Sequence, residues 1–198
     1  MEFNIKKCNV LSVTLKTKNA LKFHYTMKGL ELDAVQNTKY LGVTFTNKLT
    51  WDIHIGNISG AANRMLSLLW RNLKSCPKAL KEKAYKAYVR PKLEYASPVW
   101  DPQHQKNILK LEMVQRRAAR FVTKMPLRQS DGQYASVSER IQDLGWKSLQ
   151  ERRKNNRLVM LYRVVHNLVE IPHHTTPFPE SFNQPEVTST SLPHCSQR

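Results

Sequence analysis

Several features that mark common protein classes are missing from this chain of 198 residues. No stretch approaches the roughly 18 uninterrupted apolar residues of a membrane-spanning helix. The three cysteines, Cys8, Cys76 and Cys195, form neither a CxxC pair nor a Cys/His cluster at zinc spacing. We therefore predict free thiols in a reducing compartment, an intracellular location in the nucleus or cytoplasm, and no metal site. The adjacent His173 and His174 do not change this, because neighbouring side chains diverge.

The motifs of common phosphate-binding and hydrolytic enzymes are also absent. The chain has no GxxxxGK or GxGxxG loop and no GxSxG elbow. No two carboxylates are adjacent, as a site for two divalent ions would favour. We expect Asp33 to lie in a turn near a hairpin end and Asp52 and Asp101 to be helix N-caps. The residues by themselves predict no catalytic centre.

Acidic residues are few, and the charge is unevenly distributed. The chain has 32 Lys and Arg against 15 Asp and Glu, a net charge of +17. Residues 51–170 hold 23 basic and 10 acidic residues, whereas residues 171–198 hold 1 and 2. A basic surface on the region that reads as folded indicates a polyanionic partner, most often nucleic acid. The alternatives are an anionic membrane, which the absence of a basic helix with an aromatic-rich apolar face disfavours, and a basic surface kept for solubility.

The first 50 residues read as β-rich. Apolar and polar residues alternate over 21–27, and Lys28-Gly29 predicts the turn of an antiparallel hairpin. We expect further strands from Phe3, over 10–15 and over 39–45, the last followed by a turn at 46–48. The strand-like pattern at Phe3 predicts that the chain starts inside a fold. Trp51 is expected to dock the helix that follows.

From Ile53 the apolar spacing becomes helical. We predict a first helix that breaks at 75–77, a second from about Lys78 that Pro91 ends or kinks, and a third over about 104–125. The second helix would bury the apolar face Leu80, Ala84, Tyr85, Tyr88 and Val89.

Two possible capping boxes frame the end of the helical region, at 136–139 and 148–151. They predict a short helix that ends at Gly145 and a long one from Leu149 to about Leu168. Arg152, Arg153 and Lys154 oppose the dipole in the first turn of the long helix. Either an external anion meets them, or they pair with Glu139, Asp143 or Glu151.

The polar, proline-rich residues 171–198 are expected to be disordered. The predicted domains are therefore a β region over 1–50, a helical domain over 51–170 and a tail over 171–198. The fold class is α+β, with a small antiparallel β hairpin region followed by a mainly α-helical bundle.

Four segments resemble reverse transcriptases of non-LTR retrotransposons, of the jockey-like and chicken-repeat-like kind. They are FNIKKC at 3–8, KYLGV at 39–43 with its spacing to LTWDIHI, AYVRPKLEYASPVWDP at 87–102, and LGWKSLQERRKNNRLVMLYRVVHNLV at 144–169. Each segment alone is moderately specific. The match is strong because all four occur in the same order as in that family, over about residues 1–172. The chain departs from the family pattern after Pro172, where an aromatic SFFPRT-like stretch would follow.

The resemblance implies the end of a polymerase palm, a primer-grip hairpin and a thumb, without the palm aspartates that bind Mg²⁺ in the parent enzyme. No cofactor is implied for this chain itself. Lys7 would be an accessory residue near the incoming nucleotide, or otherwise would only add positive charge beside a palm strand. Tyr40, Leu41 and Gly42 would form the primer grip. The thumb would follow a primer–template duplex of RNA or DNA by its shape and phosphates. The candidate contacts are Arg64, Arg71, Arg90, Arg116, Arg117, Arg120, Arg152 and Arg153.

Two other interpretations stay open at this point. One is a helical interaction module for an acidic protein partner, anchored by the aromatic pairs Tyr85/Tyr88 and Tyr95/Trp100. The other is a translated pseudogene fragment without a function. Whether the product is an enzyme is left open, because the parent family's catalytic motifs are absent from this chain.

Overall fold

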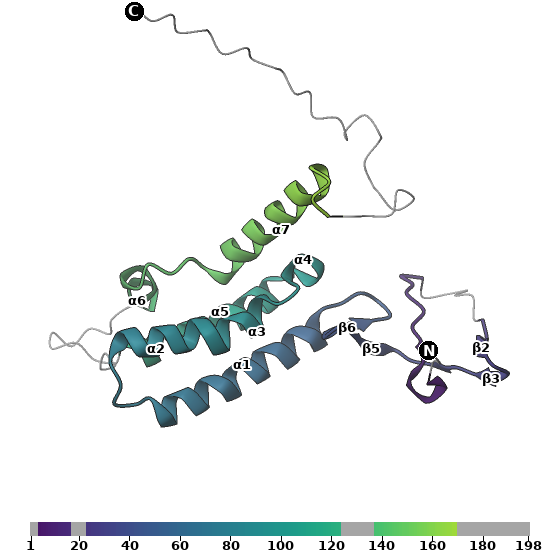
Figure 1. Cartoon of the computed structure of the whole chain (residues 1–198), viewed down its shortest axis with the longest axis horizontal. Coiled ribbons are helices and arrows are strands. Elements are labelled where there is room, and N and C mark those ends of the chain that lie inside the picture. The colour runs from purple at the N-terminus through teal and green to yellow at the C-terminus, as the bar shows by residue number, and fades with distance from the viewer. Residues whose placement is uncertain (1–3, 17–22, 124–136, 170–198) are drawn as a thin grey trace, which may run out of the picture. The chain divides into compact units, whose positions relative to one another are not determined.

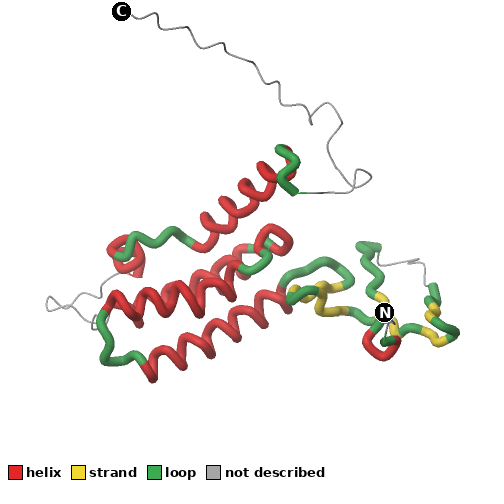
Figure 2. The backbone as a smooth tube through the Cα atoms, viewed as in Figure 1, coloured by secondary structure: helices red, strands yellow, loops and turns green. Residues whose placement is uncertain are grey.

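The computed structural model describes residues 4–16, 23–123 and 137–169. The chain divides into two compact units, Met1–Arg153 and Lys154–Arg198. Short strands and longer helices are both present, which confirms the α+β class (Figures 1 and 2). The domain boundaries expected at residues 50 and 170 stay predictions, and the expected tail lies outside the described residues.

The described part of the β region holds three separate two-stranded sheets. Antiparallel hairpins join β2 (Thr26–Met27) to β3 (Leu30–Glu31) and β5 (Asn37–Tyr40) to β6 (Val43–Thr46). The third sheet pairs β1 (Asn9–Val10) with β4 (Asp33–Ala34) in parallel. A parallel pair was not predicted, because alternation in a sequence does not reveal which strands meet.

The turn at Lys28-Gly29 is confirmed, with both residues at positive φ, 52° and 76°. Such a pair is typical of a tight two-residue hairpin. Phe3, from which a strand was expected, lies outside the described residues, and Ile5–Lys7 after it is a 3₁₀ helix, η1. Another prediction for this region is wrong. Asp33 lies inside β4, and not in a turn.

Helix α1 spans Asp52–Asn72 and ends just ahead of the predicted break. Its buried positions follow the helical spacing, because Ile55, Ala62 and Leu66 face the core. Trp51 precedes it and contacts Phe45 of β6 edge to face, with ring centroids 5.7 Å apart. Trp51 thus packs β6 against the start of α1, as predicted.

The second predicted helix forms in three pieces. They are α2 (Lys78–Ala84), the π-helical turn η2 (Tyr85–Val89) and α3 (Arg90–Glu94). Pro91 has no N–H and its ring crowds the preceding turn, so a regular α-helix cannot continue through it. The wider π turn relieves this, and the Arg90 N–H reaches back to the carbonyl of Tyr85.

The side chains that this segment buries differ in part from the prediction. Leu80 and Tyr88, predicted to face the core, are exposed, whereas Tyr85 and Val89 are buried as expected. Lys81 is only 1% exposed. Its Nζ donates to the carbonyl of Lys74, 3.0 Å away, and lies 5.5 Å from the Phe121 ring centroid.

A short helix α4 (Ser97–Trp100) and a long helix α5 (Gln105–Thr123) follow. Trp100 is fully buried, and its Nε1 donates to the Tyr95 carbonyl at 2.8 Å. Neither Asp52 nor Asp101 is the predicted N-cap. Asp52 is the first residue of α1 and accepts a hydrogen bond from Asn107 Nδ2 at 2.9 Å, and Asp101 follows α4.

Helix α6 (Val137–Asp143) ends as predicted at Gly145, which has a φ of 61°. The Trp146 N–H bonds back to the Ile141 carbonyl, so the end is a Schellman motif. Helix α7 (Leu149–Val165) begins at the predicted Ser148 cap, whose Oγ accepts from the Glu151 N–H at 3.0 Å. It ends three residues before the predicted Leu168, and the other predicted cap residue, Ser136, lies outside the described residues.

The core of the first unit lies among α1, the α2–η2–α3 segment and α5, which run side by side (Figure 1). Among the described residues, Val43 is the one member of this buried core that comes from the β region. The Tyr85 and Trp146 rings stack with centroids 4.5 Å apart, which adds the α6–α7 connection to the core. The helical part therefore carries the packing.

Candidate nucleic-acid interface

The KYLGV segment forms the tip of the β5–β6 hairpin. Tyr40 pairs with Val43, so Leu41 and Gly42 are the two turn residues, with φ values of 45° and 86°. The prediction of one strand over 39–45 is therefore wrong, because the chain reverses inside it. The turn predicted at 46–48 exists, but it connects β6 to α1. The structure thus brings Tyr40, Leu41 and Gly42 together on one protruding turn.

The turn is held by a residue from a distant segment. Tyr95 donates its hydroxyl to the Leu41 carbonyl at 3.0 Å. A Cβ on Gly42 would lie 3.2 Å from the Tyr95 ring, and the positive φ also favours glycine there. Leu41 sits in a left-handed conformation that a bulky side chain rarely adopts. The Tyr95 contact therefore holds a strained turn in one position.

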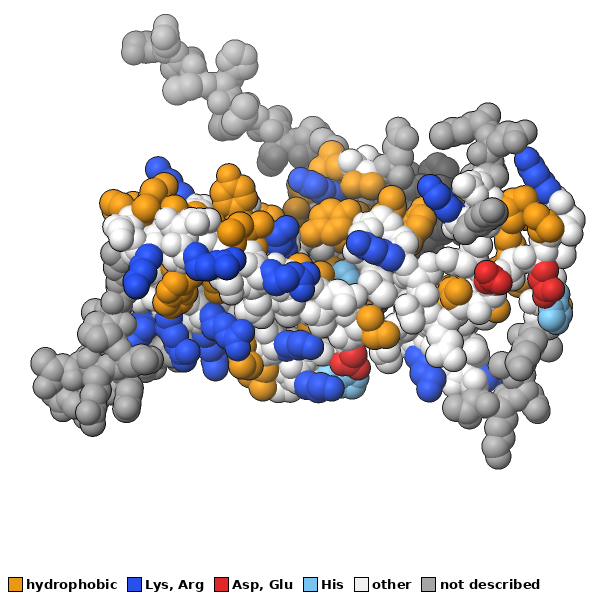
Figure 3. Space-filling model, turned by 90° about the horizontal axis from the view of Figure 1, so that it is seen from below, with side chains coloured by type: hydrophobic (Ala, Val, Ile, Leu, Met, Phe, Trp, Pro, Cys, Tyr) orange, Lys and Arg blue, Asp and Glu red, His pale blue; other side chains and the backbone are white. Residues whose placement is uncertain are grey.

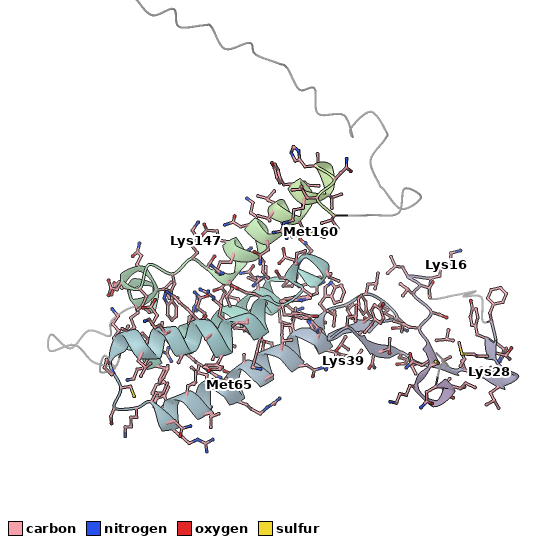
Figure 4. The ribbon with its side chains drawn as sticks, viewed as in Figure 1. Lys16, Lys28, Lys39, Met65, Lys147 and Met160 are labelled. Atoms are coloured by element: carbon pink, nitrogen blue, oxygen red, sulfur yellow. The ribbon has the colours of Figure 1, made fainter. Side chains whose placement is uncertain are left out.

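A groove of about 410 Å³ runs between this hairpin and α1. Lys39, Gly42 and Thr44 line it from the hairpin, and Gly56 and Gly60 line it from the helix. Figure 4 labels Lys39 where the hairpin meets the start of α1. The two helical glycines lie four residues apart on one face, so the helix backbone is uncovered along this groove.

A second cation lines the same groove, and a third lies beside one of its glycines. Arg64 of α1 lines it, and its Nη1 lies 3.5 Å from the place of a Cβ on Gly60. Lys110 of α5 extends over Gly56, with its Nζ 3.4 Å from the place of a Cβ there. No Asp or Glu is among the described residues that line this groove, so its potential is positive.

His54 forms part of the groove's floor and ties the hairpin to α1. Its Nδ1 accepts the Thr44 N–H at 3.2 Å, and its ring meets Trp100 edge to face, with centroids 5.1 Å apart. Burial, and secondarily the positive charge of Lys39, lower the pKa of His54. A neutral ring fits the acceptor role of Nδ1.

A second groove, of about 670 Å³, lies in the β region. It is lined by Lys7 and by Tyr40, so the proposed accessory lysine and one primer-grip residue share a surface. Lys7 is exposed at the end of η1.

The candidate arginines separate into two groups. Arg64, Arg71, Arg116, Arg117 and Arg120 are exposed along α1 and α5. Figure 3 looks at the α1 side of the chain and shows many Lys and Arg side chains with few acidic ones between them. Arg90 is half-buried and lies 3.8 Å from the Glu94 carboxylate.

The second group is Arg152 and Arg153, which are paired inside the first unit. Arg152 makes a two-pronged pair with Glu94, and this hydrogen bonding raises the pKa of Arg152. Arg153 is 0% exposed, and its Nε donates to Asp101 at 2.8 Å. The sequence predicted Glu139, Asp143 or Glu151 as the acidic partners at this helix start. That prediction is wrong for Arg152 and Arg153. A fully buried guanidinium presents no atom to a duplex, so a phosphate contact rests on the exposed arginines.

Sequence reasoning did not assign three contributors to these surfaces: Tyr95, Lys39 and Lys110. The sequence did contain a signal for the groove. Gly56 and Gly60 lie inside a helix, where each glycine lowers helix stability by about 1 kcal/mol relative to alanine, and such a cost indicates a packing or functional role. No comparable signal marked Tyr95, which is 54 positions from its partner.

The described residues contain no group of three or more His, Cys, Asp or Glu side chains arranged to hold a metal ion. Among the same residues, no helix is long and apolar enough to cross a membrane.

A probable RNA-directed DNA polymerase from transposon BS of Drosophila melanogaster is similar to this chain, with 28% identity over 116 residues. The match covers 57% of the chain but only 13% of that polymerase. No protein-family profile matches the chain. No solved structure matches it either. The similarity supports the reverse-transcriptase resemblance at this coarse level, whereas the jockey-like assignment stays a prediction.

Proposed function

We propose that this chain is the palm-end, primer-grip and thumb part of a transposon reverse transcriptase, and that it holds a primer–template duplex by its backbone. The observation that carries the proposal is the groove between the hairpin tip and α1. It joins the YLGV turn to an uncovered helix surface and to the cations Lys39 and Arg64, with Lys110 close to Gly56. The similarity to a transposon polymerase supports the same proposal.

The chemistry of the groove favours backbone contact over base readout. Lys39, Arg64 and Lys110 supply point charges for phosphates, and Gly56 and Gly60 let a sugar–phosphate chain approach closely. Base recognition would need side chains that present matched donors and acceptors. The sites assigned to Tyr40, Leu41 and Gly42 as primer grip, and to Lys7 as accessory residue, belong to this proposal.

The glycines give the sharpest test of the duplex site. Gly56→Ala and Gly60→Ala leave contacts of 3.4 and 3.5 Å to flexible cationic ends, so each should stabilise the fold by about 1 kcal/mol. Both should nevertheless weaken duplex binding, because a methyl group enters the groove. Asn72→Ala, at an exposed residue of the same helix that lines neither this groove nor a neighbouring one, is the matched control. Unchanged duplex affinity in both glycine variants would contradict the site.

Salt dependence tests the charge contribution. Each phosphate contact on B-form duplex gives a log–log slope of about −0.9, so the two cations that line the groove, Lys39 and Arg64, predict about −1.8 or steeper. The measurement is fluorescence anisotropy of a blunt duplex titrated at several salt concentrations. A flat response would remove the nucleic-acid proposal altogether.

We further propose that the chain alone does not synthesise DNA, because the palm aspartates of the parent enzyme are not in it. The test is extension of a primed RNA template by the purified chain with Mg²⁺. Extension that survives removal of contaminating polymerase would refute this part only.

A helical module for an acidic protein partner is the second candidate. It is favoured by exposed apolar side chains in the second unit, where Leu158, Leu161 and Tyr162 of α7 are all exposed. Of the predicted aromatic anchors, Tyr88 and Tyr95 are exposed, but Tyr85 and Trp100 are buried in the core. Capture of an acidic protein that survives nuclease treatment would favour this candidate.

A further inference from the structure

A third groove, of about 510 Å³, lies between the C-terminal half of α1 and α5. Asn63, Trp70 and Arg71 line it from α1, and Arg117 lines it from α5. The groove is outside the hairpin site and outside every segment that the resemblance assigns to the primer grip. One exposed indole and two guanidinium groups together favour a ligand that carries both aromatic rings and negative charge.

Trp70 is 44% exposed although it sits on the core. It lies against the buried Phe121 ring, with centroids 5.5 Å apart, and the Lys81 Nζ lies 5.5 Å from the centroid of the same Phe121 ring. This packing fixes the position of the indole and leaves much of its surface open to the groove. A rigid, half-open aromatic ring is a platform on which a flat group can stack at little entropic cost.

The charges at the groove are of one sign. Arg117 donates from Nη1 to Asn63 Oδ1 at 3.1 Å, which orients the guanidinium and leaves its other donors available. Arg71 is exposed, and no carboxylate is among the described residues that line the groove. Two oriented guanidinium groups without an acidic neighbour suit phosphate oxygens.

The groove also continues the duplex site along α1. Spacings of three and four residues place Gly56, Gly60, Asn63, Ser67, Trp70 and Arg71 on one face of the helix. Trp70 follows Gly60 by ten positions, a rise of about 15 Å. A strand that leaves the hairpin groove along this face therefore reaches Trp70 within a few nucleotides.

We propose that this groove binds an unpaired nucleic-acid strand, with a base stacked on Trp70 and phosphates on Arg71 and Arg117. The inference deepens the proposed function and rests on it, because the strand is the single-stranded continuation of the gripped duplex. A protein segment fits less well, because the cationic groove offers no carboxylate to a basic peptide, and an acidic one would leave the indole without a flat partner.

The experiment compares three probes on the full chain by anisotropy: a blunt duplex, the same duplex with an unpaired extension, and a short single strand. Trp70→Leu keeps apolar contact with Phe121 but removes the stacking surface. It should weaken binding of the single strand by roughly 5- to 150-fold and remove the advantage of the extended duplex, with blunt-duplex binding unchanged. Tyr88→Leu, at an exposed aromatic residue outside all three grooves, is the matched control.

A second variant guards against loss of folding. Arg71→Gln/Arg117→Gln touches no core residue and should lower the salt slope of single-strand binding by about 1.4, at about 0.7 per phosphate contact. Lys106→Gln/Arg163→Gln removes the same charge elsewhere and should leave that slope unchanged. Trp70 is also the most exposed of the tryptophans, so strand binding should quench fluorescence in the native chain but not in Trp70→Leu.

The outcomes separate the two proposals. If the blunt duplex does not bind, the proposed function fails. If it binds with a steep salt slope, but the extension adds nothing and Trp70→Leu binds the single strand like the native chain, only the present inference is overturned. An unchanged slope in the double arginine variant would overturn it as well.

Discussion

The β region and the helical region of the first unit are stabilised in different ways. The helical region buries whole side chains such as Trp100, Leu93 and Leu111. The β region exposes comparable ones, with Leu15 at 85% and Phe23 at 66%. Its strands are at most four residues long and pair only in twos within the described residues. Isolated two-stranded hairpins are marginally stable in water, so turns and a few tertiary contacts hold this region.

The difference shows which part of the β region packs against the helices and which part is exposed. Strand β6 is anchored to the helices through Val43 in the core, Phe45 against Trp51, and His54 against Thr44, and Tyr95 holds the turn before it. Among the residues that the structure describes before β5, none contributes a side chain to the buried core. Unpaired strand edges and exposed apolar side chains are the features of a surface that accepts further strands.

The buried ion pair offers the largest expected effect. Asp101→Ala leaves the Arg153 guanidinium buried without its carboxylate and should lower the free energy of unfolding by about 3–5 kcal/mol. Urea denaturation followed by circular dichroism measures it. Glu151→Ala breaks the exposed Lys147–Glu151 pair on the same helix and should cost only about 0.3–0.5 kcal/mol. Equal losses in the two variants would show that burial does not distinguish them.

A pair of leucine truncations compares the regions directly. Leu111→Ala removes a fully buried side chain and should cost about 2–5 kcal/mol. Leu15→Ala removes an exposed one and should change the free energy of unfolding by no more than about 0.5 kcal/mol. The same urea titration serves both. A large loss for Leu15→Ala would mean that the β region packs more than its exposure indicates.

Tyr95→Phe tests the link between the hairpin tip and the helices. It removes only the hydroxyl that bonds to Leu41, so the global loss should be about 0.5–1.5 kcal/mol. Hydrogen exchange of the hairpin amides should accelerate more than that of α1, because the strained turn loses its external contact. Tyr88→Phe is the control, and similar exchange in both variants would argue against the clamp.

The smallest effect concerns pH. Burial and Lys39 lower the pKa of His54 in the folded state below the unfolded value of about 6.5. The unfolded state therefore binds the proton more readily, so the contribution of His54 is complete above about pH 6.5 and declines as the pH falls below it. The urea midpoint between pH 7.5 and 5.5 should fall less in His54→Gln than in the native chain, and His104→Gln should behave like the native chain.

The sequence predicted local structure better than long-range pairing. The first helix, the turn at Lys28-Gly29, the helix end at Gly145 and the Ser148 cap follow from residues that are neighbours in the chain. The parallel β1–β4 pair, the Tyr95 clamp and the Arg153–Asp101 pair join residues 24 or more positions apart. Such contacts depend on how the elements pack, and a single sequence contains no record of that.

The candidate site was predicted in part. Tyr40, Leu41 and Gly42 do share one turn, and five of the arginines are exposed. Arg152 and Arg153 read as available cations because their partners, Glu94 and Asp101, lie far upstream in the chain. The unfavourable position of these cations in the first turn of α7 correctly predicted that anions pair with them. Those anions are carboxylates of the same chain and not an external ligand.

The π turn ahead of Pro91 has a consequence for how this helix tolerates change. The buried residues Lys81, Tyr85, Val89 and Leu93 recur every four positions, a spacing that would drift by roughly 40° at each step in a regular α-helix. The wider turn absorbs part of that drift, which keeps all four on one line. A widened turn amounts to one additional residue, so η2 is the place where this helix can gain or lose a residue while both of its ends stay docked.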